Sequence, residues 1–125
     1  MNKLVNSWGC VHRSRFITPT SQEAFERERM TGATMRCVGI EDGYLVLRYR
    51  DETFLASPEG YWQRPAPDYT WDQPVFVPSK GVRATIKSIC WHYKDERYFY
   101  HVIGEDGKKL KKRYYAEDLE AINER

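Results

Sequence analysis

The sequence has little excess charge and few cysteines. Lys and Arg number 20 and Asp and Glu 18, so the 125 residues carry a formal net charge of only +2 at pH 7. Such a balance excludes a global field that would draw the whole protein onto nucleic acid or an anionic membrane, and an electrostatic partner must be bound by a local patch. The three cysteines, Cys10, Cys37 and Cys90, are odd in number and lack CxxC spacing. We therefore expect a reduced, cytoplasmic setting.

Long hydrophobic runs and catalytic signatures are also missing. The N-terminal MNKLVNSWGC has no apolar signal-peptide core, and no spanning segment follows it, so we expect no membrane partner. The chain contains no GxSxG, P-loop, HExxH or Gly-rich dinucleotide motif. We expect neither an enzyme nor a cofactor.

Two Cys-x-His pairs are the remaining candidates for chemistry. In strands, Cys10 with His12 and Cys90 with His92 would each lie on one face, which makes a four-ligand zinc site conceivable. Structural zinc sites normally arise from CxxC-type knuckles and free Cys is a common core residue, so we expect no metal. A nucleophilic Cys90 would need a lowered pKa and an orienting base. His92 cannot easily turn back onto it, and we interpret His101 as a packing neighbour.

What the sequence does have is aromatic side chains, at 14% of residues with nine Tyr and four Trp. They favour strands and binding surfaces, so we expect a mostly β protein. One short helix is predicted at about 21–29, where Thr20 and Glu23 have capping-box spacing and Gly32 supplies a stop. Its narrow apolar stripe predicts that it lies across the end of a sheet and is not a core helix.

A three-stranded meander is predicted next. Apolar residues alternate on both sides of Asp42-Gly43, the strongest short-range hairpin signal, and indicate strands at about 34–40 and 44–50. A turn near residues 50–52 returns the chain as a third strand at 53–56. The expected core residues are Val38, Ile40, Leu45, Leu47 and Phe54.

The stretch 57–81 holds all but one of the six prolines, which prevents persistent strand pairing, so it is interpreted as an ordered linker. Its large aromatic residues are too apolar to leave in water together, and we expect the linker to pack on the strands. We expect a first part at 1–73 and a second at 74–125, behaving as one body.

From residue 75 onward the period returns to two, in VFVPS, VRATIKSICWHY, RYFYHVI and KKLKKRYY, with a second hairpin turn at Asp106-Gly107 and one helical turn in AEDLEAI. Four or five short strands predict a small, partly open barrel. The EDG triplets at 41–43 and 105–107 echo each other at spacings that differ by one residue. Whether they record a tandem duplication stays open.

Residues 74–119 resemble, in strand order and turn placement, SH3-like barrels of the Tudor or KOW kind. The details, including WHYKDERYFYHV and GKKLKKRYYAEDLE, are similar to an uncharacterised group of small bacterial proteins. FITPTSQEAFERE and GIEDGYLVLRY are similar to the first half of that group. The resemblance implies an SH3-like C-terminal barrel packed with an N-terminal meander and helix. It implies no reaction.

The stretch CWHYKDERYFYH, residues 90–101, is the leading candidate for a binding surface. Alternation would put Trp91, Tyr93, Tyr98 and Tyr100 on one face of a hairpin. Such rings could anchor a partner or only fill a small barrel, and both interpretations stay open. We expect a protein partner here, with a secondary surface at Trp62, Tyr69 and Trp71. By analogy, the protein could be an inhibitor or immunity-type protein of a bacterial toxin.

The alternative is a nucleic-acid-binding module that uses the basic run KKLKKR. Its cations could track phosphates with the help of Tyr114 and Tyr115 as stacking platforms. Lysines on an edge strand can equally serve to prevent edge-to-edge pairing, and acidic residues follow closely at 117, 118 and 120. The candidate cations are Lys108, Lys109, Lys111, Lys112 and Arg113.

Overall fold

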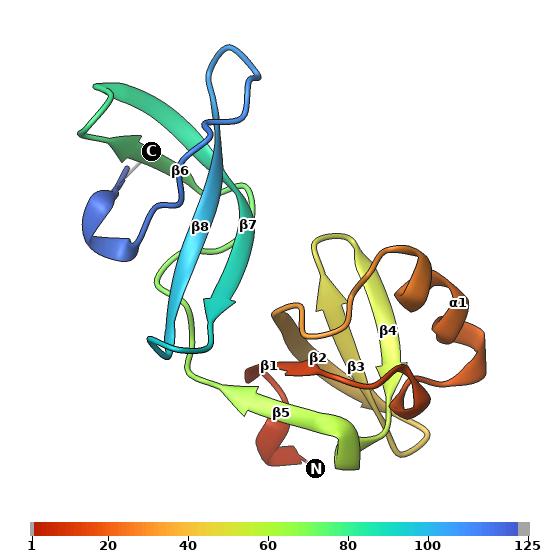
Figure 1. The fold of residues 1–125 in the computed structure, drawn as a ribbon. Helices are drawn as coiled ribbons and strands as arrows, with labels where there is room; N and C mark the ends of the chain where they lie inside the picture. Colours follow the sequence, from red (N-terminus) through yellow and green to blue (C-terminus); the bar gives the residue numbers. More distant parts are fainter. Residues whose placement is uncertain (1, 123–125) are drawn as a thin grey trace. The chain divides into compact units, whose positions relative to one another are not determined.

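The computed structural model describes residues 2–122 and is built around two antiparallel sheets (Figure 1). The chain divides into two compact units, residues 1–66 and 67–125, and each unit holds one sheet. The expected mostly β class is confirmed. The expectation that the two parts behave as one body stays a prediction. No helix among the described residues is long and apolar enough to cross a membrane.

The strands run in the order β4-β3-β2-β1-β5 in the first sheet and β8-β7-β6-β9 in the second. Their bounds are β1 Trp8–Val11, β2 Met35–Glu41, β3 Tyr44–Tyr49, β4 Glu52–Ala56, β5 Tyr61–Arg64, β6 Pro74–Val77, β7 Val82–His92, β8 Arg97–Gly104 and β9 Glu120–Ala121. The helix α1 spans Pro19–Arg27, and four short 3-10 helices are η1 Asn2–Leu4, η2 Ser14–Phe16, η3 Pro58–Gly60 and η4 Ala116–Asp118.

The predicted meander is confirmed as β2, β3 and β4. Asp42 and Gly43 both have positive φ, at 51° and 83°, as a two-residue type I′ hairpin turn requires. The expected core position of Val38 is wrong, because its side chain is 38% exposed. A bulge between Cys37 and Gly39 makes Val38 an extra residue and shifts the alternation. Cys37 is therefore buried in its place. The other core predictions, Leu45, Leu47 and Phe54, are fully or almost fully buried, and Ile40 packs against the same core.

The helix α1 begins earlier than predicted, and its role differs. Pro19 lies in the first turn of the helix. Proline suits this position because it has no N–H that would be left unpaired and because its φ is already helical. The N-cap is therefore Thr18, and the predicted capping box at Thr20 is wrong. Phe25 is fully buried and its ring meets that of Phe54 edge-on at 5.6 Å. The helix thus contributes a core residue and does not merely cross the end of the sheet.

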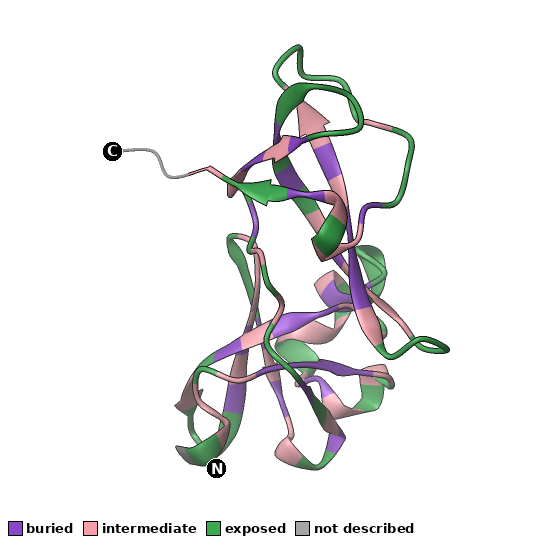
Figure 2. Ribbon diagram, turned by 90° about the vertical axis from the view of Figure 1, so that its left-hand side faces the viewer, coloured by how far each residue is buried: buried purple, intermediate pink, exposed green. Residues whose placement is uncertain are grey.

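The first part of the predicted linker contains an unpredicted strand. After η3 the chain continues as β5, which pairs antiparallel with β1. All four residues of β1 are buried, so this strand lies inside the sheet between β2 and β5. Trp62 does not pack down as expected, since it is 64% exposed on β5. β5 is the edge strand of this sheet, and Trp62 and Gln63 on it are exposed while Arg64 is buried. Figure 2 shows how buried and exposed residues alternate along the strands.

The second unit is built on the long β7–β8 hairpin. Its sheet is not closed: β8 and β9 are the two edges, and β9 pairs with β6. The predicted strand at 108–115 is wrong as a regular strand, because that segment makes only two isolated bridges to β8, at Lys109 and Tyr114. The turn before it is a three-residue loop with Gly107 at φ 81°, unlike the two-residue turn of the first unit.

Candidate functional site

The predicted aromatic face of the β7–β8 hairpin is mostly a core face. Trp91 pairs with Tyr98, and their rings meet edge-on at 4.9 Å, so the alternation was predicted correctly. Tyr100 lies on the same side of β8 as Val102, however, and both are fully buried. The interpretation of Tyr100 as a surface anchor is therefore corrected. Tyr98 is also buried, while Tyr93, beyond the end of β7, is 59% exposed.

Two residues of the predicted secondary surface serve the interior of the second unit. The ring of Tyr69 meets that of Tyr100 edge-on at 5.4 Å, and its hydroxyl donates to the Leu119 carbonyl at 3.2 Å. The Tyr100 hydroxyl accepts from the Asp68 N–H at 3.0 Å. Burial raises the pKa of Tyr100 to about 12. Trp71 is buried as well, so of the secondary surface only Trp62 is largely exposed.

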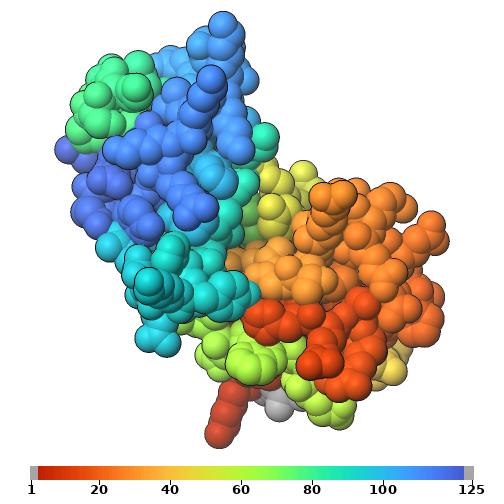
Figure 3. Space-filling model, in the orientation of Figure 1, coloured from red at the N-terminus to blue at the C-terminus, as the bar shows by residue number. Residues whose placement is uncertain are grey.

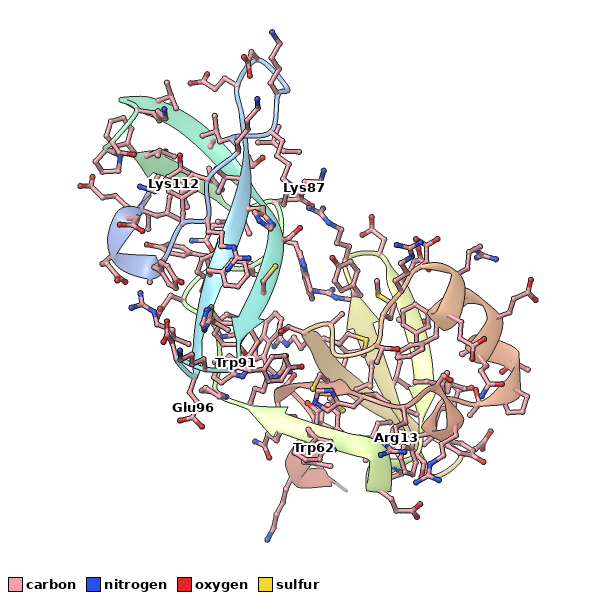
Figure 4. The ribbon with its side chains drawn as sticks, viewed as in Figure 1. Arg13, Trp62, Lys87, Trp91, Glu96 and Lys112 are labelled. Atoms are coloured by element: carbon pink, nitrogen blue, oxygen red, sulfur yellow. The ribbon has the colours of Figure 1, made fainter. Side chains whose placement is uncertain are left out.

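Trp62 lies beside a pocket on the first unit. The pocket has a volume of about 390 Å³ and is lined by His12, Arg13, Phe16, Glu59, Gly60 and Trp62. The His12 ring meets the Trp62 ring edge-on at 5.2 Å. Figure 4 shows Arg13 and Trp62 together at β5. The pocket therefore offers the rings of Phe16, Trp62 and His12 next to one cation and one carboxylate.

Local packing fixes the Trp62 pocket. Gly60 can approach Phe16 because it has no side chain, and a Cβ there would overlap the Phe16 ring. The Cys10 sulfur lies 3.3 Å from His12 Nε2. Burial, and then the charge of Arg64, lower the pKa of His12. Neutral pH therefore favours a neutral imidazole beside Trp62.

The outer edge of β5 is open at Gln63. The Cys37 N–H on β2 donates to the carbonyl of Ser7, the residue before β1, at 2.9 Å. Because bonding directions alternate along a strand, every second residue from Ser7 points to β2 and the others point to β5. Their partners on β5 are Trp62 and Arg64. The N–H and C=O of Gln63, between these two, point away from the sheet, and Gln63 is exposed.

The opposite edge of the same sheet is covered. Thr18 donates its N–H to the Leu55 carbonyl at 2.9 Å, and the Leu55 N–H donates to Ser21 Oγ at 3.3 Å. Ile17 forms a bridge with Ala56. Residues 17–21 therefore shield β4, and of the two edges of this sheet β5 is the accessible one.

The basic run 108–113 lies on the surface of the second unit, where Figure 3 shows the segment after β8 in blue. All five of its cations are exposed. Of the two predicted stacking platforms, Tyr114 is not available, and Tyr115 has an arginine over its ring. Tyr114 is fully buried with the Lys112 ammonium 5.6 Å from its ring centroid, and the Arg97 guanidinium lies 3.9 Å from that of Tyr115. Arg113 covers Phe99 at 4.7 Å.

Burial raises the pKa of all three cysteines, which disfavours their thiolate forms. Burial raises the pKa of Cys90, opposed by the nearby charges of Arg113 and Lys109. The Cys90 sulfur lies 3.9 Å from His101 Nδ1, beyond a strong hydrogen bond. Among residues 2–122, no three His, Cys, Asp or Glu side chains come together in a way that could hold a metal ion.

The described residues thus define an antiparallel β protein of two sheets, with an exposed tryptophan on an open edge strand and a separate basic surface segment. The chain belongs to a family of unknown function (DUF6960), whose model matches residues 1–120. A search of the curated proteins gives no match.

Proposed function

We propose that the protein is a non-catalytic protein-binding module that captures an extended segment of a partner protein at the edge of β5, with Trp62 as its anchor. The observation that carries this proposal is that Trp62, 64% exposed, lies on the accessible edge of its sheet beside a pocket. Singly exposed apolar residues are common on protein surfaces. The conjunction of ring, pocket and open edge is what favours a binding site here.

An added strand suits this edge for a chemical reason. The outward N–H and C=O of Gln63 can bond to the backbone of an extended peptide, which gives affinity without sequence specificity. Specificity would come from Trp62 and from the pocket, where Arg13 and Glu59 are available to charged side chains of the peptide.

The size of the Trp62 contribution follows from its exposed area. An aromatic side chain offers roughly 150–250 Å², so covering the exposed 64% removes roughly 100–160 Å² from water. At about 25 cal/mol per Å² this is worth about 2.5–4 kcal/mol. Truncating Trp62 should therefore weaken a partner roughly 60- to 700-fold.

The test is selection of peptides from a displayed library against the full chain, followed by affinity measurements with three variants. Trp62→Ala should cause the loss estimated above. Gln63→Pro removes the outward N–H at a position where an edge strand tolerates proline, and should weaken binding at least tenfold. Tyr44→Ala is the matched control, since Tyr44 is 40% exposed on β3 of the same sheet. If no peptide is selected, or if all three variants bind alike, the proposal is wrong.

We also propose an SH3-like arrangement for residues 67–125. Two features support it: the segment 109–114 bridges to β8 at one edge, and after η4 the chain pairs with β6 at the other edge as β9. NMR contacts between Tyr100 and Tyr114, and between Phe76 and Glu120, would test these pairings at the two edges of the sheet. A role as inhibitor or immunity-type protein of a bacterial toxin rests on analogy. A toxin encoded beside the gene, and bound through Trp62, would support it.

A further inference from the structure

The outer face of the β7–β8 hairpin gathers positive charge around one histidine. On β8, Tyr100 and Val102 face the core, so His101 between them faces outward. Lys109 bridges to Ile103 and shares its outward side, because opposed residues on neighbouring strands lie on the same face. Arg113 precedes the buried Tyr114 and points the other way, where it covers Phe99, which lies on the same side of β8 as His101.

A third cation comes from β7. Lys87 is the extra residue of the bulge between Ile86 and Ser88, and Ser88 pairs directly with His101. Lys87, Lys109 and Arg113 are all exposed. After burial, the charges of these three residues lower the pKa of His101, which agrees with their closeness to its ring. Two cations of the segment 108–113 and one of the β7 bulge therefore lie near the same imidazole.

The acidic residues that follow the basic run do not neutralise this cluster. Glu117 forms an ion pair with Arg97, and Asp118 accepts the Tyr115 N–H at 3.0 Å at the start of η4. Glu120 lies on β9, at the far edge of the same sheet. These carboxylates are thus close to the basic run in the sequence, but they interact elsewhere in the fold.

We infer that the cluster of Lys87, Lys109 and Arg113 around His101 binds the phosphate backbone of a single-stranded nucleic acid. This site lies on the second unit and is independent of the proposed peptide edge on the first. The exposed Lys108 and Lys111 add positive charge along the same six-residue segment, up to about 20 Å of chain, whereas Lys112 lies against the ring of Tyr114 and points away from the cluster. A single phosphate cannot use that length, whereas a polyanionic strand can.

Recognition at this site is electrostatic and insensitive to base sequence. Arginine side chains lie over the rings nearest the cluster, Phe99 and Tyr115, and Phe99 is buried, which disfavours base stacking there. With three to four phosphates neutralised, the logarithm of the binding constant should fall with the logarithm of salt concentration with a slope of about −2 to −3.

The experiment is fluorescence anisotropy of the full chain with labelled dT, dA and mixed RNA 12-mers from 20 to 200 mM NaCl. Replacing both Lys109 and Arg113 by Gln should weaken binding at least tenfold at 50 mM salt and reduce the steepness of the slope by about 1.4. The matched control is Lys80→Gln with Lys94→Gln, which removes the same charge from two turns of the same unit. It should change binding less than threefold.

Two further variants keep the test decisive. Lys109→Gln alone leaves the Arg113–Phe99 contact in place, and Arg113→Lys keeps the positive charge. Comparison with these two variants shows whether the double variant binds weakly because it lost charge or because it is misfolded. Trp62→Ala should leave nucleic-acid binding unchanged. Equal losses in the cluster pair and the control pair would overturn the inference, as would absence of binding at 20 mM salt. So would a trinucleotide or inorganic phosphate that binds as tightly as the 12-mers, because the site would then hold a single phosphate.

Discussion

Replacing Gly9 by Ala should detach β5 from its sheet. An ideal Cβ on Gly9 would overlap the carbonyl oxygen of Trp62 and lie 2.6 Å from Cζ of Tyr61. The carbonyl belongs to the β5 backbone and can move only if the strand moves. The Tyr61 ring can swing aside only by giving up its hydroxyl contact with Ser7 Oγ, at 2.7 Å. Overpacking costs about 1–3 kcal/mol and a lost hydrogen bond about 1, so Gly9→Ala should lower the free energy of unfolding by about 2–4 kcal/mol.

Gly39→Ala is the internal control for this substitution. Gly39 lies on β2 of the same sheet, where a Cβ would meet nothing within 4 Å. Its change in the free energy of unfolding should stay within about 0.5 kcal/mol, or be favourable by up to about 1. Urea unfolding followed by circular dichroism compares the two variants, and hydrogen exchange of the Trp62 and Arg64 amides reports on β5 itself. Equal midpoints and unchanged amide protection would refute the packing of β5 against Gly9.

Two predictions concern titratable groups. Burial and three nearby cations lower the pKa of His101 below the 6.5 of the unfolded chain, so folding favours the neutral imidazole. The contribution of His101 to stability is therefore present above about pH 6.5. It is lost as the pH falls through the folded pKa. His101→Gln should therefore flatten the loss of stability between pH 7.5 and 5 in urea titrations, and an unchanged slope contradicts the assignment. Burial raises the pKa of Cys10, Cys37 and Cys90. Native thiols should react with a disulfide reagent at pH 7.5 far more slowly than unfolded ones, and one fast thiol would reopen the nucleophile interpretation.

Local signals in the sequence predicted local structure well. The Asp42-Gly43 turn and the alternation around it located three strands, because a two-residue turn and its flanking strands are specified by neighbours in the chain. The exposure of Val38 could not be predicted, because a bulge is recognised only when the pairing with the partner strand is known. Thr20 is not the cap, because Pro19 already occupies the first turn of the helix.

Features set by distant partners could not be predicted. Four residues at β1 carry too short a pattern to assign, and they form a strand only because β2 and β5 lie on either side. Alternation correctly grouped Trp91, Tyr98 and Tyr100, but it does not say which side of a hairpin faces the core. The exposure of Trp62 on an edge strand was not predicted, because the prolines around β5 indicated a linker and not a strand. An apolar residue flanked by prolines and followed by polar residues could have signalled an edge strand.

The two proposed sites respond differently to salt, and this separates them in one protein sample. A partner at β5 would be held by backbone hydrogen bonds and an apolar ring, so its affinity should change little between 20 and 200 mM NaCl. A nucleic acid at the His101 cluster releases counterions, and a slope of −2 to −3 over that tenfold range predicts a loss of roughly 100- to 1000-fold. Trp62→Ala should affect only the first and the Lys109 and Arg113 pair only the second. A ligand that responds to both sets of changes would require the two surfaces to act together, which neither proposal includes.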